Sequence, residues 1–219
     1  MASTSLPLGI KLSTRSALPL SNPELYQRLV GRLLYLGFKG HSDTGFFFPV
    51  ASSFSLTTYC STERANCMDS KRSLTGYCVF LGSSLISWKT KKQTTIACST
   101  AEAEYRGLGT PTCELRWISY LLQDLHIPIS TPIPLFCDNQ AAIHIVANPI
   151  FNERTKHFEI DCHLVHDQFK TYFILPTPVP SSSQLADLFT NLLPASSFAR
   201  LLSKMGLSAF PQVHLEGRC

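Results

Sequence analysis

Residues 135–147 read LFCDNQAAIHIVA. The run before Asp138 is apolar and suits a buried strand, whereas the small-residue pattern after it predicts a helix over 140–147. A carboxylate at the end of a buried strand is costly unless another group compensates its charge. The stretch therefore predicts a strand–helix unit with a functional carboxylate at the junction. The alternative is that Asp138 serves only as the N-cap of the helix.

This unit lies within a longer alternation of strand and helix patterns. Apolar runs bounded by Gly, Ser, Thr and Pro predict strands over 76–82, 84–88, 94–98, 132–137 and 171–175. Helical spacing of apolar residues predicts helices over 24–38, 99–108, 115–125, 140–147, 155–170, 183–193 and 196–205. A hairpin followed by strand–helix alternation predicts an α/β domain whose mixed, five-stranded sheet is flanked by helices.

Composition narrows the class of protein. With 44% hydrophobic and 16% charged residues, most of the chain should be globular rather than disordered. The net charge of +4 is compatible with a nucleic-acid partner without requiring one. No apolar window is long enough to predict a membrane span. The cysteines show no C-x-x-C spacing, and no signal peptide precedes them, so we expect reduced, intracellular thiols.

The first 23 residues contain Lys11 and Arg15 but no acidic residue. Such a composition is typical of an organelle transit peptide, here a plastid one. It equally suits a chain whose start is an accident of truncation, and we favour that interpretation. The compartment is therefore left open by the sequence.

Carboxylates recur at the ends of predicted elements. Glu102 lies in the first turn of the helix over 99–108, Asp138 follows a strand, and Asp187 lies in the first turn of a later helix. Clustered carboxylates repel one another unless a cation neutralises them, and oxygen ligands favour Mg²⁺ or Mn²⁺. Each also has a structural alternative: Glu102 completes an S-x-x-E capping box with Ser99, and Asp187 suits a helix dipole.

Longer strings carry a family resemblance. The segments 71–108, 134–161 and 184–190 closely resemble the ribonuclease H domain at the end of copia-type retrotransposon polyproteins. Upstream, 25–36 resembles the end of the preceding reverse transcriptase region. The resemblance implies a ribonuclease H-like fold and divides the chain into a polymerase remnant at 1–55, a ribonuclease H-like domain at 56–207 and a tail at 208–219.

The resemblance also implies roles for individual residues. Glu102, Asp138 and Asp187 match catalytic, metal-binding carboxylates of the family. The family places a fourth on its first strand, in a Y-S-D-A-D-W-like run, but this chain reads YCSTER from Tyr59. Ser61 therefore occupies the position of the first catalytic aspartate. Glu63 is a possible substitute, although it lies roughly 6–7 Å further along the same face of the strand.

Basic residues suggest where nucleic acid would bind. Lysines beside Trp88 suit a phosphate backbone, although a solvated loop is an equal alternative. Three further residues belong to a family motif in 153–159. The predicted nucleic-acid-binding residues are Lys89, Lys91, Lys92, Arg154, Lys156 and His157.

The expected activity is metal-dependent hydrolysis of the RNA strand in an RNA–DNA hybrid, weakened by the loss at Ser61. Two further departures favour a truncated, decayed copy. Phe54 nearly abuts the first domain strand, and Gly107, Gly109 and Pro111 interrupt a helix. The alternatives are a non-catalytic nucleic-acid-binding module and an inert transposon-derived fragment. Oligomeric state is not predicted.

Overall fold

The computed structural model describes residues 44–46, 54–148, 160–191, 193–205 and 207–209. The predicted helix over 24–38 lies outside these residues, as do Arg154, Lys156 and His157. The start of the helix predicted over 155–170 also lies outside them.

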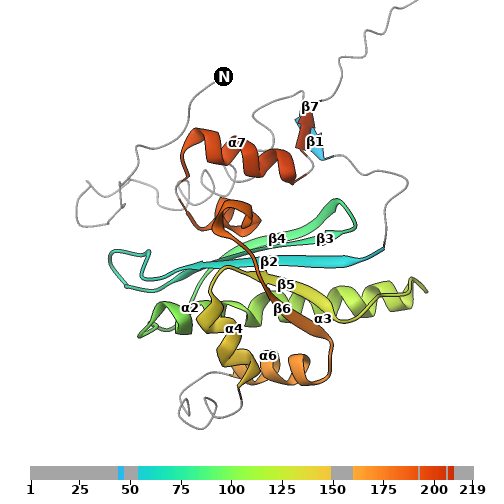
Figure 1. The fold of residues 1–219 in the computed structure, drawn as a ribbon, viewed down its shortest axis with the longest axis horizontal. Helices are drawn as coiled ribbons and strands as arrows, with labels where there is room; N and C mark the ends of the chain where they lie inside the picture. The colour runs from blue at the N-terminus through green and yellow to red at the C-terminus, as the bar shows by residue number, and fades with distance from the viewer. Residues whose placement is uncertain (1–43, 47–53, 149–159, 192, 206, 210–219) are drawn as a thin grey trace, which may run out of the picture.

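A mixed sheet forms the centre of the domain, with strand order β4-β3-β2-β5-β6 (Figure 1). Within this sheet β2, β3 and β4 pair antiparallel, β5 pairs in parallel with β2, and β6 pairs in parallel with β5. This arrangement confirms the predicted mixed, five-stranded sheet. The strands are β2 (Leu56–Glu63), β3 (Leu74–Leu81), β4 (Ser84–Lys92), β5 (Ile133–Cys137) and β6 (Ile174–Pro178).

Two predicted strands differ from the structure. Residues 94–98 form no strand, because the ladder ends at Gln93, whose N–H bonds Ser73 O, and Arg64 donates to the carbonyls of the segment that follows. The strand predicted over 171–175 instead begins at Ile174, because Tyr172 adopts a positive φ in the turn after the preceding helix. The central strand β2 covers the first strand that the family resemblance implies.

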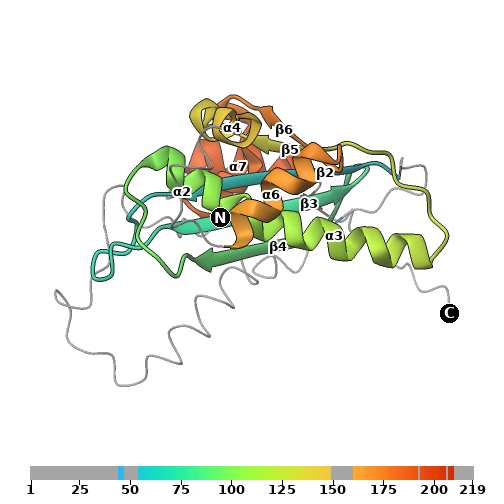
Figure 2. The same cartoon turned by 90° about the horizontal axis from the view of Figure 1, so that it is seen from below.

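Helices cover one face of the sheet and short turns plus one helix cover the other (Figure 1). On the first face, α6 lies between α3 and α4 (Figure 2). The helices there are α2 (Thr100–Gly107), α3 (Gly109–Asp124), α4 (Gln140–Ala147) and α6 (Ile160–Lys170). On the second face lie α7 (Ala195–Lys204) and the 3₁₀ turns η1 (Ser181–Ser183) and η2 (Leu185–Phe189), which replace the helix predicted over 183–193. Each face encloses its own apolar core.

The expected helix interruption is slight. Leu108 separates α2 from α3 but keeps helical backbone angles, and its N–H bonds Glu104 O while its carbonyl accepts from Thr112 N. Pro111 falls in the first turn of α3, where a missing N–H is tolerated. The two helices therefore run on from one another.

A second, two-stranded sheet pairs β1 (Thr44–Phe46) antiparallel with β7 (Leu207–Ala209). It joins a part of the predicted 1–55 segment to the end of the predicted ribonuclease H-like domain. Among the helices that the structure describes, none is long and apolar enough to cross a membrane.

Candidate active site

Asp138 lies immediately after β5, where the parallel pairing of β5 with β2 ends. Tyr59 of β2 is the register partner of Phe136 of β5, and their rings stack. The same register, followed two residues further along both strands, leads to Ser61 and Asp138 on the same face of the sheet. The N-cap of α4 is Asn139, whose side chain accepts from Ala142 N. Asp138 is therefore not needed as a cap. Its Oδ2 accepts a hydrogen bond of 3.2 Å from Ser181 Oγ.

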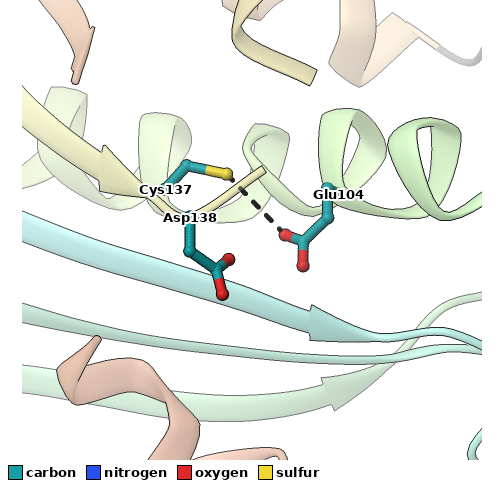
Figure 3. A group of neighbouring side chains, drawn as sticks. All are labelled: Glu104, Cys137 and Asp138. Carbon is teal, nitrogen blue, oxygen red and sulfur yellow. Dashed lines mark hydrogen bonds between the residues drawn. The ribbon is translucent and has the colours of Figure 1, made fainter. Parts of the chain in front are cut away.

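Glu104, and not Glu102, is the glutamate beside Asp138. The ligand atoms of Glu104, Cys137 and Asp138 all lie within 4.8 Å of one another (Figure 3). Glu104 is only 4% exposed, and its Oε1 accepts from Thr62 N of β2 at 3.0 Å. A helix carboxylate is thus held against the end of the central strand.

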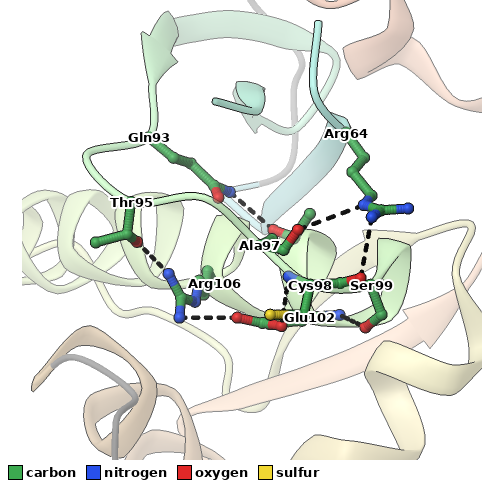
Figure 4. A network of polar contacts seen from close by, with 9 residues as sticks. Arg64, Gln93, Thr95, Ala97, Cys98, Ser99, Glu102 and Arg106 are labelled. Carbon is green, nitrogen blue, oxygen red and sulfur yellow. Dashed lines mark hydrogen bonds and ion pairs between the residues drawn. The ribbon is translucent and has the colours of Figure 1, made fainter. Parts of the chain in front are cut away.

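Glu102 lies on the outer side of the same helix (Figure 4). Its Oε1 pairs with Arg106 Nη2 at 2.8 Å, and its Oε2 accepts from Cys98 N at 2.8 Å. Ser99 Oγ accepts from Glu102 N at 3.1 Å, so half of the predicted capping box forms, while the Glu102 side chain accepts from Cys98 N rather than from Ser99 N. These contacts occupy Glu102 with the start of α2, which is the structural alternative noted for it from the sequence.

The sequence contains a signal that favours Glu104. Buried leucines recur with helical spacing at Leu108, between α2 and α3, and at Leu115 and Leu122 of α3, so that the three share one face. Extending that spacing back by four residues reaches Glu104, whereas Glu102 falls outside it. A carboxylate on the apolar side of a helix calls for a functional explanation.

Asp187 reaches the site from the opposite face of the sheet. It lies in η2 and is 7% exposed. Gly76 of β3, the register partner of Ser61, allows this approach, because a Cβ at Gly76 would lie 2.7 Å from Phe189 Cβ. Gly107 does the same for α2, since a Cβ there would lie 2.2 Å from Thr62 Oγ1.

The pKa values of Glu104 and Asp187 are raised, first by burial and then by the negative charges of neighbouring carboxylates. Burial raises the pKa of Glu104 to about 8; the hydrogen bond from Thr62 N opposes this, and the charges of Asp138 and Asp187 add to it. Burial also raises the pKa of Asp187 to about 6; a hydrogen bond from Ser61 opposes this, while Asp138 and Glu63 add to it. The three carboxylates therefore act on one another electrostatically.

Ser61 lies beside Asp187, to which its side chain donates a hydrogen bond. Its side chain is 4% exposed, and Thr190 Oγ1 donates to Ser61 Oγ at 3.4 Å. Glu63 raises the pKa of Asp187, so it is near the site, but Asn66 Nδ2 donates to its carboxylate. Asp187 Oδ1 is buried and accepts no hydrogen bond from the described residues.

No protein-family model matches the chain. The chain is 32% identical over 235 residues to the retrovirus-related Pol polyprotein from transposon RE1 of Arabidopsis thaliana. The alignment covers 92% of the chain and 16% of that polyprotein. For the corresponding polyprotein from transposon RE2 of the same plant the identity is 31% over 242 residues, covering 95% and 17%. The chain belongs to the copia-type retrotransposon Pol polyproteins.

A third Pol polyprotein, from transposon TNT 1-94 of Nicotiana tabacum, is 28% identical over 152 residues, covering 69% of the chain and 11% of the polyprotein. The chain spans less than a fifth of the length of these Pol relatives. Its fold is ribonuclease H-like, with the mixed sheet, central β2 and flanking helices that the family resemblance implies.

Solved structures similar to this Pol segment include the N-terminal ribonuclease H domain of a Mycobacterium tuberculosis protein. The identity is 13% and the TM-score 0.42, covering 69% of this chain and 98% of that one. The foamy viral protease–reverse transcriptase in complex with double-stranded DNA gives 13% identity and a TM-score of 0.42, covering 70% and 99%.

Three of the six predicted nucleic-acid-binding residues lie on an edge strand. Lys89, Lys91 and Lys92 are exposed on β4, the outermost strand of the sheet. Alternation along the strand separates Lys91 from Lys92. Lys92 Nζ donates to Cys67 Sγ at 3.1 Å and to Ser70 Oγ at 3.5 Å, in the loop between β2 and β3.

Proposed function

We propose that this domain is a ribonuclease H-like, metal-dependent phosphodiesterase directed at the RNA strand of RNA–DNA hybrids, and that Ser61 leaves it impaired. The observation that carries the proposal is that Glu104 and Asp138 lie together at the end of the sheet, while Asp187, which accepts a hydrogen bond from Ser61, acts on both from the opposite face. Membership of the Pol family supports it. Glu104 takes the role that the sequence suggested for Glu102.

The donor set fits hard divalent cations. Carboxylate oxygens are the preferred ligands of Mg²⁺ and Mn²⁺, and the raised pKa values of Glu104 and Asp187 mark charge that a cation would neutralise. Asp187 Oδ1, buried without a hydrogen bond from the described residues, is a further available ligand. Glu104, Asp138 and Asp187 would hold the metal. Bound divalent ions would supply activation of water and stabilisation of the leaving oxygen.

The chain's own groups prepare the site for this chemistry. Thr62 N and Ser181 Oγ fix the orientations of Glu104 and Asp138. An open pocket of about 350 Å³ beside Asp138, lined also by Gln140 and Val179, leaves room for a substrate. The exposed lysines of β4 would bind the phosphate backbone.

Ser61 is the weak point of this arrangement. A neutral hydroxyl cannot replace a bridging carboxylate, so metal binding has one charge fewer. Loss of one preorganised electrostatic contact lowers a rate by about 10²–10³-fold, and a poorly held metal costs more. We therefore expect little cleavage of an RNA–DNA hybrid in Mg²⁺ by the unaltered chain.

Cleavage of a labelled hybrid tests the proposal. Ser61→Asp should gain activity, because it restores the missing charge next to Asp138. In that background Glu104→Gln should abolish the gain, and Glu102→Gln, the matched control two residues away, should keep it. Asp138→Asn should also abolish it. Loss with Glu102→Gln but not with Glu104→Gln would reverse our assignment.

The role of Glu63 is tested in the same assay. If the unaltered chain cleaves well and Glu63→Gln stops it, Glu63 has replaced the missing aspartate. A second candidate function, hybrid binding without cleavage, is favoured specifically by Ser61. It predicts that the unaltered chain binds hybrids and that Ser61→Asp, although folded, stays inactive.

A further inference from the structure

Cys137 brings a sulfur ligand into the carboxylate cluster. Its Sγ lies 3.9 Å from Glu104 Oε2, and both are within 4.8 Å of a carboxylate oxygen of Asp138 (Figure 3). The thiol is fully buried. The proposed hydrolysis uses oxygen ligands alone, so this sulfur has no role in it.

The spacing of these atoms suits a thiophilic ion. With Zn–S near 2.3 Å and Zn–O near 2.0 Å, tetrahedral geometry places sulfur and oxygen about 3.5 Å apart. The observed 3.9 Å between Cys137 Sγ and Glu104 Oε2 is close to that value. The widest pair in the group, at no more than 4.8 Å, would need to close by at most about 1.5 Å.

The chemistry of the donor set distinguishes metals. A thiolate with two carboxylates favours Zn²⁺ or Cd²⁺, whereas Mg²⁺ takes oxygen ligands and leaves the sulfur aside. A nearby buried carboxylate also favours a bound cation. Asp187 is only 7% exposed, and its Oδ1 accepts no hydrogen bond from the described residues. Asp187 lies outside the group whose ligand atoms are within 4.8 Å of one another, but its charge acts on Glu104.

We propose that Glu104, Cys137 and Asp138 form a binding site for a thiophilic divalent cation, with Zn²⁺ or Cd²⁺ as its ligand class. A metal–sulfur bond forms as the S–H bond breaks, and the proton passes to solvent. This ion shares Glu104 and Asp138 with the proposed hydrolytic site, so it inhibits Mg²⁺-dependent cleavage by competition. That inhibition, but not the binding, rests on the proposed function.

Titration of the full chain with Co²⁺, as a spectroscopic substitute for Zn²⁺, tests the binding. The expected result is a sulfur-to-cobalt charge-transfer band that Zn²⁺ or Cd²⁺ bleaches. Cys137→Ser should remove this band and weaken binding by more than the roughly 10–100-fold that loss of an outer-shell partner costs. Cys78→Ser is the matched control, because Cys78 is equally buried but packs on the opposite face of the sheet.

An unchanged band in Cys137→Ser, with circular dichroism showing a folded protein, would overturn the site, as would equal loss in Cys78→Ser. Glu104→Gln should weaken binding as well, which a site made only of surface thiols would not show. Binding through Cys137 in a protein that cannot be made to cleave hybrids would support this site and count against the proposed function. If Ser61→Asp cleaves hybrids and Cd²⁺ does not inhibit it, the result would support the proposed function and count against this site.

Discussion

The two sides of helix α2 carry glutamates two residues apart, yet their surroundings differ completely. On the outer side, Glu102 has a cation at 2.8 Å and the N–H of Cys98 (Figure 4). On the inner side, Glu104 has one backbone N–H, a thiol and the like charges of Asp138 and Asp187 (Figure 3). The outer glutamate stabilises the helix start, whereas the inner one is a buried charge that needs an ion.

This difference separates structural from functional carboxylates without reference to a family. A group whose charge is already compensated has no free energy to gain from a metal, while a group held among like charges has much to gain.

Glu104→Gln should make the metal-free protein more stable at alkaline pH. The pKa of Glu104 is raised by burial to about 8 from its ordinary value of 4.5, so between these values the folded state binds more protons than the unfolded state. The free energy of unfolding should therefore fall as pH rises through this window, and the loss is complete above pH 8. At roughly 1.4 kcal/mol per pKa unit, the effect is of the order of a few kcal/mol.

Urea denaturation with a chelator present measures this dependence. Above about pH 6 the contribution of Asp187, whose pKa is raised to about 6, no longer changes. Glu104→Gln should flatten the curve between about pH 6 and 9, and Glu102→Gln should leave its slope intact. If the free energy of unfolding of Glu104→Gln still falls with pH in this window, the raised pKa of Glu104 is not the cause of the fall.

Gly107→Ala should destabilise the fold by about 1–3 kcal/mol, despite the better helix propensity of alanine. The new Cβ would lie 2.2 Å from Thr62 Oγ1, so α2 must move away from β2. Thr62→Ala removes that oxygen, and the double variant should be less destabilised than the sum of the single changes. Additive effects in urea denaturation would mean that the close approach of Gly107 and Thr62 does not position the helix.

Glu102→Gln should cost less, about 0.3–1 kcal/mol, because it removes a partly buried i,i+4 ion pair and weakens a cap. Arg106→Gln should cost a similar amount, since it removes the other member of the pair. Both effects should shrink at high salt, because screening acts on partly exposed charges. Thermal unfolding at low and high ionic strength provides the measurement, and a salt-independent loss would argue against the ion pair.

Thiol labelling should distinguish the two sides without altering stability. Cys98, next to Glu102, is exposed, whereas Cys137, next to Glu104, is fully buried. Maleimide followed by peptide mass spectrometry should modify Cys98 in the folded protein and spare Cys137 until denaturant is added. Early modification of Cys137 would show that the inner side opens readily.

The sequence by itself determined the architecture. Alternating apolar runs and helical spacing were sufficient for a mixed sheet flanked by helices, because burial periodicity is local. The position of Asp138, between a buried strand and a small-residue helix, was equally local. The first strand came only from the resemblance, because β2 reads LTTYCSTE and its Thr and Ser residues hide the apolar alternation of a strand. Residues 94–98, in contrast, look like a strand but do not pair as one.

The tertiary structure alone decided which carboxylates meet. Glu102 and Glu104 both occur in the motif of the family, and only the rotation of α2 against β2 separates them. That rotation is set by Gly107 lying against Thr62, a contact between residues far apart in the chain. Asp187 depends in the same way on Gly76, which admits η2 to the sheet. Such contacts combine segments whose separate patterns carry no information about their mutual orientation, so only packing could reveal them.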